Sequence, residues 1–179
     1  MNYSQIIPHD CANGEGWRTT LFVSGCDFHC PGCFNPESQN FDCGEPFTMY
    51  TMANILDMVK DDKVSGLSIL GGDPLCQDIS DLIKLIDLCK RVRYIGKTVW
   101  LWSGFTFEQL FSPYNNYEEV PQWKYRQKLI EHVDIFIDGP FTKEQKDLTL
   151  KWRGSKNQRV IDVQKTIQQN KIILYEGDD

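Results

Sequence analysis

The chain has 179 residues, of which 41% are hydrophobic and 25% are charged, a balance ordinary for a globular protein and sufficient for one domain over 1–179. Its net charge of −6 disfavours nucleic acid as a partner, because phosphate binding needs a clustered positive surface. No apolar run approaches the roughly 20 residues that cross a bilayer, and no signal-peptide pattern is present, so we expect a cytoplasmic location without a membrane partner. Seven cysteines, an odd number, also favour a reducing compartment over a disulfide framework.

Strands and helices are expected to alternate along most of the chain. After a lead-in at 1–16, the apolar patterns predict, in chain order, a strand at 17–23, a helix around 52–59, a strand at 67–70, a helix around 79–89, a strand at 98–102, a short helix at 107–111, a helix at 123–131 and a strand at 133–137. The segment 112–122 is interpreted as an inserted loop, and 162–179 as a C-terminal extension with a late strand at 172–175. This order is typical of βαβ units, so the predicted fold class is α/β with a mainly parallel sheet.

Four distinctive segments each follow a predicted strand. They are the cysteine loop at 26–33, Gly71-Gly72, Ser103-Gly104 and Asp138-Gly139. In barrels and open α/β sheets the binding site lies at the carboxyl ends of the strands. We therefore expect these segments to meet at one edge of the sheet.

Three cysteines, Cys26, Cys30 and Cys33, stand at positions i, i+4 and i+7 after the first predicted strand. This spacing also fits one face of a helix, but Pro31 and Gly32 disfavour a helix and predict a loop with inward-pointing sulfurs. Thiolates at this density select an iron–sulfur cluster, zinc or cuprous copper. A structural zinc site or an ordinary ferredoxin cluster takes four ligands, whereas three thiolates on a cuboidal cluster would leave one iron open to a small molecule.

The other segments permit either a binding role or an ordinary turn. In Gly71-Gly72-Asp73-Pro74, glycine allows close approach to the backbone, whose carbonyls could accept hydrogen bonds from an ammonium group. Ser103 could bind a ribose or a carboxylate, and Asp138 could hold a cation or ribose hydroxyls, but turns explain both residues equally well. The basic stretch 151–159 reads by itself as a solvated charged face.

Together these motifs resemble the radical S-adenosylmethionine enzymes, which carry CxxxCxxC after a first strand and a GGE motif after a later one. Within that family, SGCxxxCPGCxN at 24–35, and DGPF at 138–141 followed by WRGSxNQ at 152–158, are similar to the branch that activates anaerobic ribonucleoside-triphosphate reductases. The chain departs from the wider pattern at Gly32, where an aromatic residue is common, and at Asp73, which replaces the glutamate.

The resemblance implies an incomplete, open β/α barrel and one 4Fe–4S cluster held by Cys26, Cys30 and Cys33. It also implies that S-adenosylmethionine binds at the open iron, with Phe34 near the adenine. The residues expected to contact this cofactor are Gly32, Cys33, Phe34, Gly71, Gly72, Asp73, Ser103 and Asp138.

The implied activity is reductive cleavage of S-adenosylmethionine and abstraction of hydrogen from a glycine of a partner protein. That partner would be the large subunit of an anaerobic ribonucleoside-triphosphate reductase, which would keep the glycyl radical, and a flavodoxin- or ferredoxin-type donor would supply the electron.

Two alternative functions stay open. One is another radical enzyme with a short barrel, either a different glycyl-radical activase or a deazapurine-type carbene synthase. The other is a non-catalytic zinc or electron-transfer module, with a fourth ligand from Cys11, Cys43 or His29.

Overall fold

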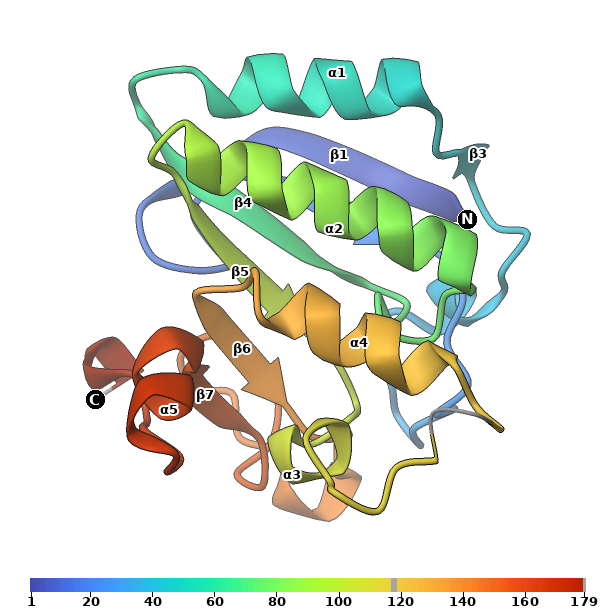
Figure 1. Ribbon diagram of the computed structural model, residues 1–179, viewed down its shortest axis with the longest axis vertical. Helices are drawn as coiled ribbons and strands as arrows, with labels where there is room; N and C mark the ends of the chain where they lie inside the picture. Colours follow the sequence, from blue (N-terminus) through green and yellow to red (C-terminus); the bar gives the residue numbers. More distant parts are fainter. Residues whose placement is uncertain (117–118, 179) are drawn as a thin grey trace.

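The computed structural model describes residues 1–116 and 119–178 and shows an α/β fold built on a seven-stranded sheet (Figure 1). From one edge to the other the strands are β3 (Glu45–Pro46), β1 (Asn2–Asp10), β2 (Trp17–Val23), β4 (Val64–Gly71), β5 (Thr98–Trp102), β6 (Ile135–Asp138) and β7 (Arg159–Asp162). The central strands β2, β4, β5 and β6 run parallel, whereas β1, β3 and β7 pair antiparallel. The predicted α/β class is confirmed, and the predicted parallel pairing holds in the middle of a mixed sheet.

One face of the sheet is covered by three helices, α1 (Met49–Val59), α2 (Ile79–Tyr94) and α4 (Gln122–Ile130) (Figure 1). The other described helices are α3 (Phe107–Leu110), α5 (Val163–Gln169) and the short 3-10 helices Pro36–Gln39, Lys143–Gln145 and Glu176–Asp178. The N-cap of helix α1 is Thr48, whose hydroxyl accepts the Thr51 N–H at 3.2 Å. The N-cap of helix α2 is Asp78, whose carboxylate accepts the Asp81 N–H at 3.1 Å.

Strand β5 shows how the two faces of the sheet are filled. Val99 and Leu101 belong to the main core beneath the helices. Trp100 points to the opposite face, where its ring packs edge-on against Trp152 at 4.8 Å and Tyr175 at 5.4 Å between ring centroids. Side chains alternate between the faces of a strand, so a segment near the C-terminus covers the face that carries Trp100.

The sequence predictions are wrong near both ends of the chain. The expected lead-in at 1–16 contains β1, whose half-exposed residues lack the apolar run by which the other strands are recognised. Residues 172–175 do not form a regular strand, because Leu174 makes only an isolated bridge to Ile161. Instead, β7 and α5 occupy 159–169, where no helix or strand is predicted.

The predicted insertion at 112–122 connects α3 to α4. Its described parts, 112–116 and 119–121, contain turns and no regular helix or strand, and residues 117–118 lie outside the described part of the chain. None of the described helices is both long and apolar enough to cross a membrane.

Candidate cofactor site

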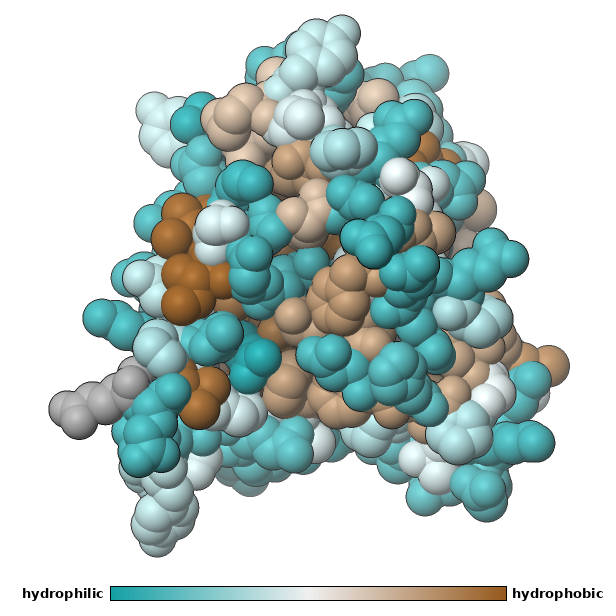
Figure 2. Space-filling model, turned by 90° about the vertical axis from the view of Figure 1, so that its right-hand side faces the viewer, coloured by the Kyte–Doolittle hydropathy of each residue, from teal (hydrophilic) through white to brown (hydrophobic). Residues whose placement is uncertain are grey.

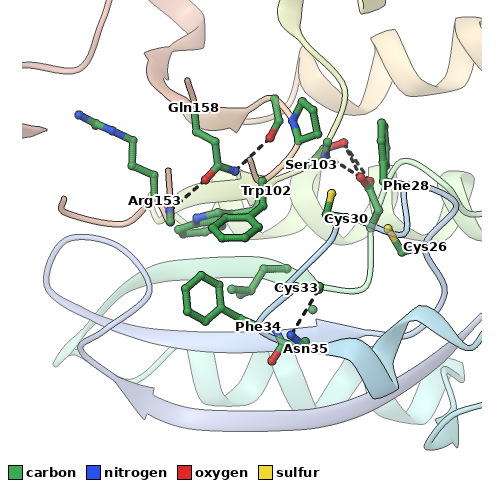
Figure 3. A pocket seen from close by; sticks show the side chains of 18 of the residues that line it. Cys26, Phe28, Cys30, Cys33, Phe34, Asn35, Trp102, Ser103, Arg153 and Gln158 are labelled. Atoms are coloured by element: carbon green, nitrogen blue, oxygen red, sulfur yellow. Dashed lines mark hydrogen bonds between the residues drawn. The ribbon is translucent and has the colours of Figure 1, made fainter. Parts of the chain in front are cut away.

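The loops that follow β2, β4, β5 and β6 line a cavity of about 480 Å³ (Figure 3). Eight of the residues predicted from the sequence lie in its wall, namely Cys26, Cys30, Cys33, Phe34, Gly71, Gly72, Asp73 and Ser103. Gly32 and Asp138 are not part of the wall, although their neighbours Cys33 and Gly139 are. Tertiary structure therefore brings most of the predicted residues to one edge of the sheet, and their contact with a cofactor stays a prediction.

The cysteine segment is a loop, as the proline and glycine in it suggest. The N–H groups of Gly25 and Cys26 donate to the carbonyls of Ser38 and Gln39, at 2.7 Å and 3.1 Å. The Cys33 N–H donates to the Cys30 carbonyl at 3.1 Å and closes a tight turn between the second and third cysteines. The three thiols are free and half-buried, and Figure 3 shows them around the same cavity.

The cysteines and histidine considered as a fourth ligand lie elsewhere. Cys11 is exposed, and Cys43 lines a separate hollow beside 35–38. The exposed ring of His29 places Nδ1 3.2 Å from the Gln39 side-chain oxygen. These three residues are not in the wall of the cavity, so the geometry gives no support to a four-ligand site that includes them.

The two glycines after β4 are required by close chain-to-chain contact. Gly71 has a φ of 110°, in the region that favours glycine, and a Cβ there would lie 2.6 Å from the Val23 carbonyl oxygen. A Cβ on Gly72 would lie 2.5 Å from the carbonyl oxygen of Gly25. The Asp73 N–H also donates to this Gly25 carbonyl at 2.8 Å. The glycines thus let the loop after β4 lie directly against the cysteine loop.

Asp73 joins the loops that follow β4 and β5. Its carboxylate accepts the Leu75 N–H at 2.8 Å and the Gly104 N–H at 2.7 Å, and the Ser103 hydroxyl lies 2.9 Å from both carboxylate oxygens. The side chain is buried, and this burial raises the pKa of Asp73 to about 6 despite the hydrogen bonds that stabilise its charged form. Two residues predicted to contact the cofactor, Asp73 and Ser103, are therefore hydrogen-bonded to each other.

Two residues that the sequence did not single out hold these loops in place. Buried Gln77 donates from its amide nitrogen to the carbonyls of Ser24 and Asp73, both at 3.0 Å. Arg126 of α4 donates to the Leu75 carbonyl at 2.7 Å, and its guanidinium lies 4.7 Å from the ring centroid of Phe105. Asp73 is only four residues from Gln77, but the Ser24 carbonyl that Gln77 reaches and the Leu75 carbonyl that Arg126 reaches are distant in sequence, so no local motif marks either residue.

Cys76 is a third residue missed from the sequence. It is buried behind the cysteine loop, and its sulfur, the Cys26 sulfur and a carboxylate oxygen of Asp73 all lie within 4.8 Å of one another. A hydrogen bond with the Cys76 thiol lowers the pKa of Cys26, and the same bond and burial raise the pKa of Cys76. By contrast, burial raises the pKa of Cys30.

Asp138 is buried at the end of β6 and is already paired. Its carboxylate accepts the Arg159 Nε–H at 3.0 Å and the Phe107 N–H at the first residue of α3 at 2.9 Å. Arg159 also donates to Glu108 from both terminal nitrogens, at 2.8 Å and 2.7 Å. The position at the edge of the sheet agrees with the sequence, but these partners indicate a residue that fixes the loop.

The segment 151–159 is part of the cavity wall and not a free charged face. Trp152, Arg153, Gly154 and Gln158 line the cavity. The Gln158 amide donates to the Gly139 carbonyl at 3.0 Å, and its oxygen accepts the Gly154 N–H at 2.9 Å. The DGPF and WRGSxNQ motifs, which are separate in sequence, therefore form one hydrogen-bonded unit.

The cavity fits a cluster with a bound nucleoside in three respects. Three free thiols from one loop reach it, and thiolates are the ligands that iron–sulfur clusters prefer. Its walls carry aromatic rings, including Phe28, Phe34 and Trp102. Its volume lies within the roughly 300–1,000 Å³ that small-molecule sites have.

Comparison with known proteins identifies the family. Residues 12–161 match the family model described as "4Fe-4S single cluster domain". The anaerobic ribonucleoside-triphosphate reductase-activating protein of Escherichia coli K12 is 36% identical over 163 residues, which cover 89% of this chain and 97% of that protein. The chain belongs to the anaerobic ribonucleoside-triphosphate reductase-activating protein family. Members from Pasteurella multocida and phage T4 are 39% and 35% identical, over 88% and 89% of this chain and 95% and 93% of their own lengths.

Membership in this family, together with the match to a single-cluster 4Fe–4S domain, supports an iron–sulfur cluster in this chain. The matched region, 12–161, contains every residue predicted for the site, including the three cysteines of the loop. The relatives carry the name of the branch that the SGCxxxCPGCxN and WRGSxNQ motifs resemble, so the resemblance inferred from those motifs is confirmed.

Proposed function

We propose that this protein activates an anaerobic ribonucleoside-triphosphate reductase by the chemistry of the radical S-adenosylmethionine enzymes. The observation that carries the proposal is the convergence of three free thiols, from one loop, on a cavity that aromatic rings and the loops after β4 and β5 complete. The names of the relatives supply the partner.

In this proposal Cys26, Cys30 and Cys33 hold a 4Fe–4S cluster, and no protein side chain binds the fourth iron. The cluster and S-adenosylmethionine, when bound, supply one-electron reductive cleavage and removal of a hydrogen atom from a glycine of the partner. The chain's own residues position these groups. Phe34 offers a ring to the adenine, and backbone carbonyls around Gly72 accept hydrogen bonds from the amino group of the methionine moiety.

Asp73 and Ser103 act in this scheme through the shape of the loop. Because these two side chains are hydrogen-bonded to each other, we expect them to hold the Gly71-Gly72 backbone in position. Gly32 and Asp138 would act from just outside the cavity wall.

Access for a large substrate also matters, because the reacting glycine belongs to another protein. Figure 2 views the side where the loop after β2 lies, and apolar side chains gather in the middle of that face with hydrophilic ones around them.

The parallel strands β2, β4, β5 and β6, with helices over one face, are compatible with part of an open β/α barrel, which we propose as the fold type. We expect the electron to come from a flavodoxin- or ferredoxin-type protein and the exchange to take place in the cytoplasm.

Replacement of Cys30 by alanine tests the proposal. We expect Cys30→Ala, reconstituted anaerobically with iron and sulfide, to lose the intact cluster and the release of 5′-deoxyadenosine while keeping its far-ultraviolet circular dichroism. Cys43→Ala is the matched control, because Cys43 is also a half-buried free thiol but lies outside the cavity wall, and it should keep both properties.

The final readout is a glycyl radical, detected by electron paramagnetic resonance, after mixing with the reductase and S-adenosylmethionine. Cofactor cleavage by Cys30→Ala would refute the ligand assignment. Cleavage by the unmodified protein without a radical on the reductase would favour another radical enzyme, and a colourless zinc protein would favour a structural module.

A further inference from the structure

The C-terminal segment 172–178 lies beyond the matched family region and contains none of the sequence motifs, yet it packs behind the cavity wall. The backbone N–H of Tyr175 donates to the Val160 carbonyl at 2.9 Å, and the Asp162 N–H donates to the Ile173 carbonyl at 2.9 Å. These bonds hold the segment along β7, at one edge of the sheet. The segment is thus a fixed part of the fold, and its side chains have defined neighbours.

The ring of Tyr175 packs against a tryptophan of the cavity wall. Its centroid lies 6.0 Å from that of Trp152 and 5.4 Å from that of Trp100. Trp152 lines the cavity, and its backbone carbonyl accepts the indole N–H of Trp102, another wall residue, at 2.7 Å. Tyr175 itself is not in the wall, so it supports one side of the cavity from behind Trp152.

The hydroxyl of the same tyrosine reaches a second part of the wall. It donates to the Glu15 carboxylate, in the turn between β1 and β2. Two residues earlier in this turn, Asn13 lines the cavity. Strands β4, β5 and β6 separate β2 from β7 in the sheet, so the hydrogen bond from Tyr175 to Glu15 spans the face that carries Trp100. One side chain therefore joins two wall segments that the sheet itself keeps apart.

We propose that Tyr175 is a positioning residue that sets the width of the cofactor cavity, and with it the affinity for S-adenosylmethionine, through Trp152 and Glu15. The inference rests on the proposed function, since it takes S-adenosylmethionine as the ligand. Contacts that fix two walls before the ligand binds reduce the ordering that binding would otherwise require. Loss of these contacts should therefore weaken binding and leave the chemical step at saturating cofactor unchanged.

Replacement of Tyr175 tests the inference through the affinity of the reconstituted protein. Equilibrium dialysis against S-adenosylmethionine measures Kd, with the cluster kept oxidised so that no cleavage occurs. Tyr175→Leu removes the ring and the hydroxyl and should raise Kd about tenfold, the order of change that aromatic contacts and one hydrogen bond contribute. Tyr175→Phe keeps the ring and should raise Kd about threefold. Both variants should release 5′-deoxyadenosine at saturating cofactor within about twofold of the unmodified rate.

Glu15 and Leu174 provide the matched controls. Glu15→Ala removes the same hydrogen bond from its other end, so it should match Tyr175→Phe, and the double variant should bind no more weakly than either single one. Glu15→Gln keeps an acceptor for the hydroxyl and should bind within about twofold of the unmodified protein. Leu174 precedes Tyr175 and is 54% exposed, so Leu174→Ala should leave Kd unchanged.

The inference and the proposed function fail in different ways. An unchanged Kd in folded Tyr175→Leu and Tyr175→Phe with full iron content overturns the inference and leaves the proposed function intact. A saturating rate that falls in step with the affinity also overturns it, because the tyrosine then supports the fold as a whole. If Tyr175→Leu does not fold, Tyr175→Phe and Glu15→Ala decide, since both keep the ring in place. An unmodified protein that binds no S-adenosylmethionine refutes the proposed function, and the inference with it.

Discussion

The pairing of Asp138 with Arg159 makes a counterintuitive stability prediction. Asp138 is 1% exposed, whereas the Arg159 side chain is 32% exposed and also contacts Glu108 at the surface. Removing one partner of a buried pair costs about 3–5 kcal/mol, because the remaining charge is left without compensation. In Arg159→Met the buried carboxylate keeps its hydrogen bond from the Phe107 N–H, so we expect the free energy of unfolding to fall by about 3 kcal/mol. This value is at the low end of the range because Arg159 is partly solvated.

Replacing the other partner, Asp138, should cost less stability. In Asp138→Asn the amide oxygen can still accept the Phe107 N–H, and Arg159 keeps water and Glu108, so we expect a loss of about 1–2 kcal/mol. The double variant, which combines Asp138→Asn with Arg159→Met, should be more stable than Arg159→Met alone by about 1 kcal/mol, because the buried charge is gone. A second mutation that restores stability is the signature of an uncompensated charge.

The assay is urea denaturation followed by far-ultraviolet circular dichroism, under anaerobic conditions and at equal iron content for all variants. For a chain of this size, a loss of 3 kcal/mol also corresponds to a decrease of about 6–12 °C in the melting temperature. A double variant no more stable than Arg159→Met would refute the reasoning. The affinity for S-adenosylmethionine, measured on Asp138→Asn, separates the two roles: an unchanged affinity assigns Asp138 to the scaffold, and a large loss supports cofactor contact.

Three further changes probe the loops and the mouth of the cavity. Gln77→Leu leaves the buried carbonyls of Ser24 and Asp73 without their donor, so we expect the free energy of unfolding in urea to fall by about 1–3 kcal/mol and cluster iron to be released faster. A variant as stable as the unmodified protein would contradict this role of Gln77. Gly104→Ala places a Cβ 2.6 Å from the ring of Phe28, which should cost about 1–3 kcal/mol and lower the iron content after reconstitution. Leu148 is an apolar side chain in the cavity wall and is 77% exposed, as a contact residue for a docked partner would be. Leu148→Asp should therefore weaken binding to the reductase about tenfold and change the free energy of unfolding by less than about 0.5 kcal/mol. The control Tyr94→Asp, beside a separate hollow at the end of α2, should leave binding unchanged.

Local sequence determined the elements at the centre of the sheet and the composition of the site. Strands 17–23 and 98–102 agree with the structure in both bounds. The second is almost continuously apolar, as buried parallel strands are, and the first ends in the apolar run Leu21-Phe22-Val23. Strand β1 was missed since it lies towards an edge and is half exposed, and β7 was missed because four residues carry too little periodicity. Pro31 and Gly32 were enough to predict a loop for the cysteines, because their backbone limits act locally.

Only the tertiary structure decided what each side chain at this edge of the sheet contacts. Asp73 and Ser103 are 30 residues apart, and their hydrogen bond depends on the parallel pairing of β4 with β5. Asp138 meets Arg159 for the same kind of reason, through the antiparallel pairing of β6 with β7. Cys76 stands in no metal-ligand spacing with Cys26, and the Gly71-Gly72 turn brings them together by letting two loops touch. Sequence spacing fixes which groups are available, whereas strand register and close packing fix which of them bond to one another.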